Sequence, residues 1–191
     1  ELAPAPVLGV GVGTPGVIDP TGVVLRSTNL AWRDVPLAQT IATRTGRPTH
    51  VGNDTSLAAL AEFGAQEGDA SNLMLVEISD GVGAGIVLSG AIHRGEAWAA
   101  GEIGHLLAVA DGDVCTCGKQ GCLETVASVP NILKTAGVKA NGHLDTDHPG
   151  LVSAVERAAD HVGAVLAAAV AILDVHHIVL AGPLNAFELM K

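Results

Sequence analysis

Apolar residues recur at regular spacings within successive segments of the chain, and the spacing in each segment predicts its secondary structure. The β-branched run in residues 7–13, followed by the turn letters TPG and by GVVLRST in residues 22–28, predicts two strands joined by a turn. Residues 35–46 carry apolar side chains at helical spacing and end on Gly46, which predicts a helix with a glycine stop.

The remaining blocks continue this alternation of strands and helices. PTHVGND predicts a short strand, and TSLAALAEFGAQEG predicts a helix with Leu57, Leu60, Ala61 and Gly64 on one face. NLMLVEIS and AGIVLSGAIHRG predict a hairpin around the glycine turn DGVG. A helix near LETVASVPNILKTAG, a polar loop, an Ala-rich helix over residues 151–173 and the strand HHIVLAG follow. This order predicts an α/β fold with a mixed sheet covered by helices.

Composition narrows the size and the packing of this fold. A chain of 191 residues with 48% hydrophobic content is long enough for one ordinary domain or two small lobes. Only 2% of the residues are aromatic and 24 are glycine, so we expect a core of Ala, Val, Leu and Ile with close backbone approaches. The formal net charge of -10 argues against a nucleic-acid surface on this chain.

The longest apolar run and the start of the chain indicate the cellular setting in which the protein is expected. The run VGAVLAAAVAIL has about a dozen residues, fewer than the roughly 20 of a membrane span, so it predicts a core helix and no membrane partner. The chain opens without a basic secretory start, so a cytoplasmic, reducing setting is the default expectation. It also opens without Met and close to a predicted strand, so we expect a fragment.

The three cysteines gather in the Gly-rich loop CTCGKQGC, as Cys115, Cys117 and Cys122, and His105 precedes them. A Cys3His set fills the four positions of tetrahedral zinc, and glycines at 118 and 121 let the loop curl so that the sulfurs converge. The alternative is three reduced thiols beside an unrelated histidine. Since a filled shell leaves no open position for water, the pattern predicts structural rather than catalytic Zn²⁺.

These residues and their surroundings carry a resemblance to a known family. The run GEIGH, from Gly101 to His105, followed by CTCGKQGCLETVAS, closely resembles the signature of the ROK family of bacterial sugar kinases and sugar-responsive transcriptional repressors. The segments GVGTPGVID, STNLAW, VGNDTSLAALAE and DGVGAGIVLSG follow the order and approximate spacing of that family. The resemblance covers nearly the whole chain.

The resemblance implies an actin-like, ribonuclease-H-like fold of two lobes with a sugar in the cleft between them. Residues 1–52 are then the C-terminal part of the first lobe, and residues 53–191 are the second, zinc-containing lobe, truncated at its C-terminus. The phosphate turn of the family's kinases, of the type Asp-x-Gly-Gly-Thr, and the helix-turn-helix of its repressors both belong upstream of residue 1.

By the same resemblance, Asn53 and Asp54 bind sugar hydroxyls on one side of the cleft, and Glu102, His105 and Glu124 bind those on the other. Asp54 is the position of the general base in the kinases. Each residue also has a plainer interpretation. Asn53 and Asp54 lie where a helix N-cap is expected. Glu102 fits a solvated loop, and Glu124 fits a first helical turn.

Two weaker candidates complete the predicted site. Asn29, in the NLAW turn, is a further candidate sugar ligand, although it also fits a simple turn former. Gly81, Gly83 and Gly85 are candidates for a phosphate loop, although a hairpin needs glycines for its own backbone.

The hairpin turn favours one branch of the family over the other. Family kinases usually carry Gly-Thr-Gly at this turn, whereas Asp80 stands here in the place of the threonine. A carboxylate 4 Å from a phosphate charge costs on the order of 4 kcal/mol at an effective dielectric of 20, unless Mg²⁺ bridges the two or the side chain points to solvent. Pro183, where the kinases have a glycine-rich adenosine loop, also removes one backbone donor.

The sequence therefore favours the sugar-sensing effector domain of a ROK-type transcriptional regulator, which binds a hexose or hexose derivative. DNA contact is expected only through an N-terminal segment, and a homodimer or a higher oligomer follows from the family's habit. The alternative is an ATP-dependent, glucokinase-like sugar kinase that uses Asp54 as base together with ATP and Mg²⁺.

Overall fold

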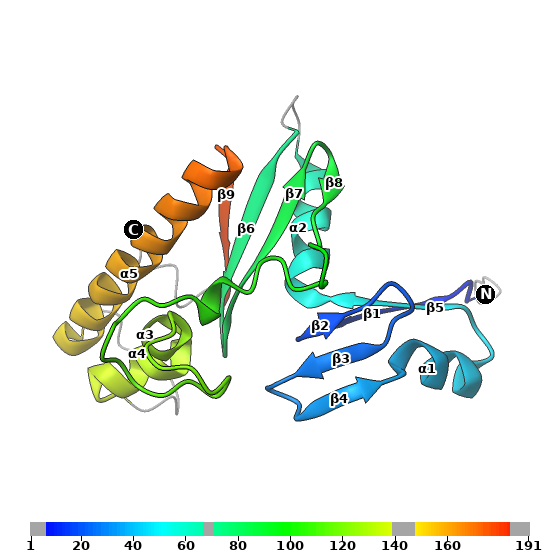
Figure 1. Cartoon of the computed structure of the whole chain (residues 1–191), viewed down its shortest axis with the longest axis horizontal. Helices are drawn as coiled ribbons and strands as arrows, with labels where there is room; N and C mark the ends of the chain where they lie inside the picture. The colour runs from blue at the N-terminus through cyan, green and yellow to red at the C-terminus, as the bar shows by residue number, and fades with distance from the viewer. Residues whose placement is uncertain (1–6, 67–70, 139–147, 184–191) are drawn as a thin grey trace, which may run out of the picture.

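The computed structural model describes residues 7–66, 71–138 and 148–183. It contains three groups of strands and five α-helices among these residues (Figure 1). Strands β1 to β5 and helix α1 form one part of the molecule, and β6 to β9 with α3, α4 and α5 form the other, with α2 following directly on β5. The predicted α/β organisation with a mixed sheet is confirmed.

The first part holds a parallel pair and a small antiparallel sheet. Strand β1 (Val10–Thr14) pairs in parallel with β5 (Thr49–Asn53), and β3 (Val24–Ser27) pairs with β2 (Val17–Ile18) on one side and β4 (Trp32–Val35) on the other. Helix α1 (Leu37–Thr45) ends on Gly46 in the left-handed conformation, as the sequence predicts.

The second part is a four-stranded mixed sheet in the order β8-β7-β6-β9. Strands β6 (Leu73–Ile78) and β7 (Val82–Leu88) form the predicted hairpin, β8 (Ala91–Ile92) extends it, and β9 (Ile178–Ala181) lies parallel to β6. Alternation along β6 sends Met74, Val76 and Ile78 to the main core on one face of the sheet.

Helices cover both faces of this sheet (Figure 1). Helices α3 (Glu124–Ala127), α4 (Val129–Ala136) and α5 (Pro149–Leu173) supply the other side of the main core. The opposite face, with Leu73 and Leu75 of β6, packs against α2 (Asp54–Ala65) through Ala59. None of the helices in the described residues is long and apolar enough to cross a membrane.

Small residues let α2 lie close against β7. A Cβ added to Gly85 would fall 2.4 Å from both the Ala59 side chain and the Thr55 carbonyl oxygen. The expected small-residue packing is therefore present where α2 crosses the sheet.

Two helical regions differ from the sequence-based expectation. In α2 the buried side chains are Thr55 and Ala59, whereas Leu57 and Leu60 are 40% and 43% exposed. The close approach of α2 to β7 leaves no room for leucine on the buried face, so the apolar face seen in the sequence is not the face that packs on the sheet.

The predicted helix over residues 123–137 is in fact two helices, α3 and α4. Ser128 between them is extended, and the α4 helix carries Pro130 in its first turn. The Val129 amide donates to the Ser79 carbonyl at 2.9 Å, which ties the start of α4 to the hairpin turn. The break is therefore explained by proline at a helix start and by this tertiary hydrogen bond.

Candidate functional site

A cleft of about 620 Å³ lies between the first strands, the start of α2, the hairpin turn and the loop before α3. Its volume falls in the range of small-molecule sites. All six predicted sugar ligands line it: Asn29, Asn53, Asp54, Glu102, His105 and Glu124. The structure therefore brings together residues that are far apart in the sequence.

Asn53 and Asp54 lie at the junction of β5 and α2. The Asn53 side chain accepts a hydrogen bond from the Ser56 amide at 2.8 Å, so it is the N-cap of α2, and its amide nitrogen donates to the Gly16 carbonyl at 3.2 Å. The capping interpretation of Asn53 is thus confirmed. The second amide hydrogen of Asn53 has no acceptor among the described residues, so capping leaves a donor for a ligand.

Asp54 is half-buried and its carboxyl is hard to ionise. Burial raises the pKa of Asp54 above its ordinary value of 3.8. The Thr55 amide, which donates to Asp54 at 2.9 Å, opposes this rise, and the negative charge of Glu77 adds to it. A carboxylate with a raised pKa in a cleft suits either acceptance of a ligand hydroxyl or proton abstraction from it.

On the other side of the cleft, a short 3-10 turn and the start of α3 supply the acids. Residues Ile103–His105 form the turn, and the Glu102 carboxylate lies 3.7 Å from Nε2 of His105. The Glu124 carboxylate accepts a hydrogen bond from the Val82 amide at 3.2 Å. A Cβ on Gly81 would lie 2.8 Å from that carboxylate, so a side chain at this position would displace the Glu124 carboxylate.

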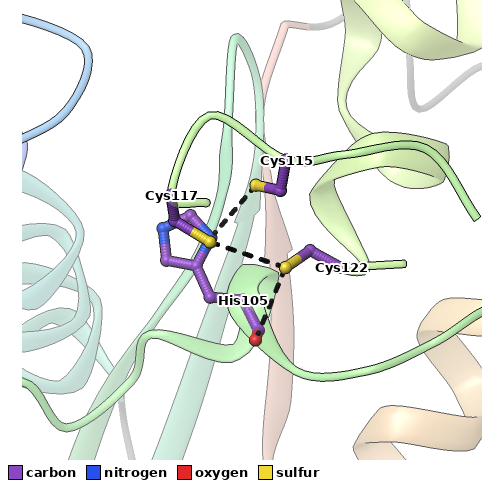
Figure 2. Close-up of side chains that lie close together, drawn as sticks. All are labelled: His105, Cys115, Cys117 and Cys122. Carbon is purple, nitrogen blue, oxygen red and sulfur yellow. Dashed lines mark hydrogen bonds between the residues drawn. The ribbon is translucent and has the colours of Figure 1, made fainter. Parts of the chain in front are cut away.

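The thiols and the imidazole converge as the loop pattern predicts, and Figure 2 shows the four side chains pointing toward one another. One ligand atom from each of His105, Cys115, Cys117 and Cys122 lies within 4.8 Å of the others. Cys115 Sγ is 3.7 Å from His105 Nδ1, and Cys117 Sγ is 3.6 Å from Cys122 Sγ. Tetrahedral zinc with ordinary bond lengths separates its ligands by about 3.6–3.8 Å. The donor set therefore fits Zn²⁺.

The thiols of this cluster differ in how readily they lose a proton. Burial, with hydrogen bonds to Cys117 and Cys115, raises the pKa of the Cys122 thiol to about 12. Burial also acts on Cys117, but hydrogen bonds from the Lys119 amide and the neighbouring thiols outweigh it and lower the pKa of Cys117. A cation bound here displaces the Cys122 proton, so its affinity falls as pH falls.

The loop backbone shows why glycine is needed in it. Gly118 and Gly121 have φ angles of +90° and +72°. A side chain on Gly121 would also collide with the Val109 carbonyl oxygen. The predicted curl of the loop is therefore present.

The three glycines considered for a phosphate loop have different surroundings. Gly81 and Gly83 line the cleft, and Gly83 faces the Thr55 hydroxyl. Gly85 lies against α2, where the helix backbone leaves no space for a side chain.

Residue-by-residue reasoning missed a polar group on the floor of the cleft. The Glu77 carboxylate accepts hydrogen bonds from the Thr55 hydroxyl at 2.9 Å and from the Ser79 hydroxyl at 3.2 Å. The signal was present, because Glu77 is the one charged residue in the apolar strand LMLVEI. A second missed residue is Ser27, a buried lining residue whose hydroxyl has no hydrogen-bond partner in the described part of the chain.

The arrangement of sugar-type ligands beside a Cys3His cluster agrees with the comparison of this sequence with protein families. The model of the ROK family matches residues 3–191. The chain belongs to the ROK family. Its α/β architecture is that family's actin-like fold.

Curated ROK relatives include both kinases and repressors. The chain is 41% identical over 157 residues to a glucokinase from Halalkalibacterium halodurans, covering 78% of this chain and 48% of the relative. It is 43% identical over 125 residues to a putative xylose repressor from Caldicellulosiruptor sp., covering 64% of this chain and 31% of the relative. The chain thus spans half or less of the length of these relatives.

The solved ROK structures that resemble this chain also include both a kinase and a regulator. A ROK glucokinase from Streptomyces griseus, in complex with glucose and AMPPNP, matches with a TM-score of 0.83 and 28% identity, covering 94% of this chain and 66% of that one. A ROK transcriptional regulator, a homologue of the E. coli MLC protein, matches with the same TM-score and identity, covering 95% and 52%. Fold similarity alone therefore does not separate the two branches.

Proposed function

We propose that the chain is the sugar-sensing effector domain of a ROK-type transcriptional regulator, with a hexose or hexose derivative in its cleft. Residues 1–52 belong to the first lobe in this proposal and residues 53–191 to the second. DNA contact belongs to a segment upstream of residue 1, and the working form is a homodimer or a higher oligomer. Sugar closes the two lobes and so alters the attached DNA-binding segment.

The proposed sugar ligands supply both donors and acceptors. Asp54, Glu102 and Glu124 offer carboxylate oxygens around one cleft, and Asn29 and Asn53 offer amide groups that donate as well as accept. This mixture suits a ring of hydroxyls, each of which both donates and accepts. His105 belongs to the same wall and also to the metal cluster.

Zn²⁺ has a structural role in this proposal. His105, Cys115, Cys117 and Cys122 hold it, and a filled shell supplies no activated water. The metal fixes the loop that separates Glu102 from Glu124, and Cys115 Sγ lies 4.0 Å from the Glu124 carboxylate. Metal binding therefore orients ligands on one side of the cleft.

The observation that favours the regulator function over the kinase function is the position of Asp80, in the turn between β6 and β7. It lines the cleft together with Gly81, at the place where the family's kinases usually carry threonine. An additional negative charge at this turn opposes the approach of a nucleotide phosphate.

A second candidate function, an ATP-dependent sugar kinase, is favoured by one observation. Asp54 has the raised pKa and the cleft position expected of a general base. In that case ATP and Mg²⁺ are the cofactors, and Gly81, Gly83 and Gly85 belong to the phosphate loop.

Reading the gene upstream of residue 1 tests the choice. The regulator proposal predicts a helix-turn-helix there and no Asp-x-Gly-Gly-Thr turn. An intact phosphate turn near the start codon, without a DNA-binding segment, would contradict it.

A further inference from the structure

Glu77 is a charged residue in the face of β6 that meets α2. Alternation along the strand places it on the same side as Leu73 and Leu75, which pack against that helix. Its carboxylate lies between the hydroxyls of Thr55 and Ser79, at 2.9 and 3.2 Å, and it lines the cleft. No lysine or arginine forms a salt bridge with Glu77 in the part of the chain that is described. The charge of Glu77 therefore remains directed at the cleft.

The N-terminus of α2 lies beside Glu77, and the free amides of a helix N-terminus can bind an anion such as phosphate. In α2, however, the chain's own oxygens already use the first-turn donors. The Thr55 amide donates to Asp54 at 2.9 Å, and the Ser56 amide donates to Asn53 at 2.8 Å. The Thr55 hydroxyl donates to Glu77. Glu77 thus takes the Thr55 hydroxyl, a donor beside the helix N-terminus that an incoming anion would otherwise use.

One backbone donor next to the hairpin turn is also in use. The Val82 amide already donates to the Glu124 carboxylate at 3.2 Å. Five carboxylates line the cleft, and Arg26 is the sole lysine or arginine among the described lining residues. Among these carboxylates, Glu77 lies close enough to Asp54 for its charge to add to burial in raising the pKa of Asp54.

We propose that Glu77 is a specificity-determining residue that closes this cleft to phosphoryl groups. The ligand of the cleft is then an uncharged sugar. Neither a phosphorylated sugar nor a nucleoside triphosphate binds there. The inference rests on the proposed sugar site, and it assigns the charge class of the ligand that this site takes.

The first test compares glucose with glucose 6-phosphate by calorimetric titration in Mg²⁺-free buffer, using the gene product that contains this chain. Glucose 6-phosphate is expected to bind at least about tenfold more weakly than glucose, because of repulsion at short range. Glu77→Gln keeps the size of the side chain and its ability to form hydrogen bonds. It should reduce the ratio of the dissociation constant of glucose 6-phosphate to that of glucose at least about fivefold. Glu156→Gln removes the same charge from an exposed position on α5, and the ratio should not change.

A second test needs no sugar. Pyrophosphate, followed by thermal shift, should give no saturable stabilisation of the unaltered protein but a saturable one with Glu77→Gln. Saturable pyrophosphate binding by the unaltered protein, or equal responses of the two proteins, would overturn the role of Glu77. Failure of the unaltered protein to bind any of glucose, xylose and N-acetylmannosamine would instead count against the proposed sugar site, while the pyrophosphate result still decides the role of Glu77.

Discussion

At the residue scale, Asp54 is where the structure adds most to the sequence. The motif gave its candidate role, but only the packed cleft shows that burial and the charge of Glu77 raise its pKa. Glu77 stands out in the sequence as the one charged residue of an apolar strand, but the strand pattern does not show what its carboxylate contacts. Its role follows from contact with Thr55, which is remote in the sequence.

Sugar affinity should fall in acid because of Asp54. In the proposed site, a ligand hydroxyl donates a hydrogen bond to the Asp54 carboxylate. The contribution of this hydrogen bond to sugar affinity is complete above the pKa of Asp54 and is lost as the pH falls through that pKa. Because that pKa is raised above 3.8, the loss begins at a higher pH than for an exposed aspartate. Below the pKa, affinity should drop about tenfold per pH unit for this group.

Titrations of the preferred sugar between about pH 4 and 7 measure this effect. Asp54→Asn should bind sugar more weakly at neutral pH and should lose the corresponding acid phase. An acid profile identical in the two proteins would contradict the assignment of Asp54.

At the element scale, the close contact of α2 with β7 sets the shape of the cleft. The sequence predicted both elements and grouped Leu57 and Leu60 on one face of α2, but the buried residues of the helix are Thr55 and Ala59. Hydrophobic spacing reports which side chains are apolar, not how closely a glycine strand lets a helix approach. The same limit explains why the role of Gly85 emerged only from the structure.

Two glycine substitutions separate this packing from general backbone effects. Gly85→Ala should destabilise the fold by about 1–3 kcal/mol, because the new methyl group meets the Ala59 side chain and the Thr55 carbonyl. Gly64 lies in α2 as well, but it has open space around it. Gly64→Ala should therefore stabilise the fold by about 0.5–1 kcal/mol. Urea unfolding measures both. Equal effects of the two changes would contradict the close helix-strand contact.

At the scale of the whole molecule, the cleft depends on segments from both parts of the chain. The family resemblance named six candidate ligands and implied a cleft between two lobes, and all six residues line one cleft in the structure. Local patterns alone could not have shown this, because β5, the hairpin turn and the cysteine loop must meet in space. The family shows the fold, while the relatives include both functions.

Removing the metal should weaken folding and sugar binding together. A strong chelator is expected to lower the melting temperature by roughly 10 °C or more, since structural zinc contributes directly to folding free energy. Sugar affinity should fall in the same sample because Glu102 and Glu124 flank the metal loop. Zn²⁺ should restore both properties and Mg²⁺ neither. A verified metal-free protein with unchanged stability and affinity would contradict the structural role.

The most direct test of the sensor proposal follows binding and phosphoryl transfer in one experiment. The gene product that contains this chain is titrated with glucose, xylose and N-acetylmannosamine, and each sugar is then incubated with ATP and Mg²⁺ while sugar phosphate is measured. The proposal predicts saturable binding of an uncharged sugar and no turnover above background. Phosphorylation of that sugar at about 1–100 per second, the usual range for kinases, would contradict it.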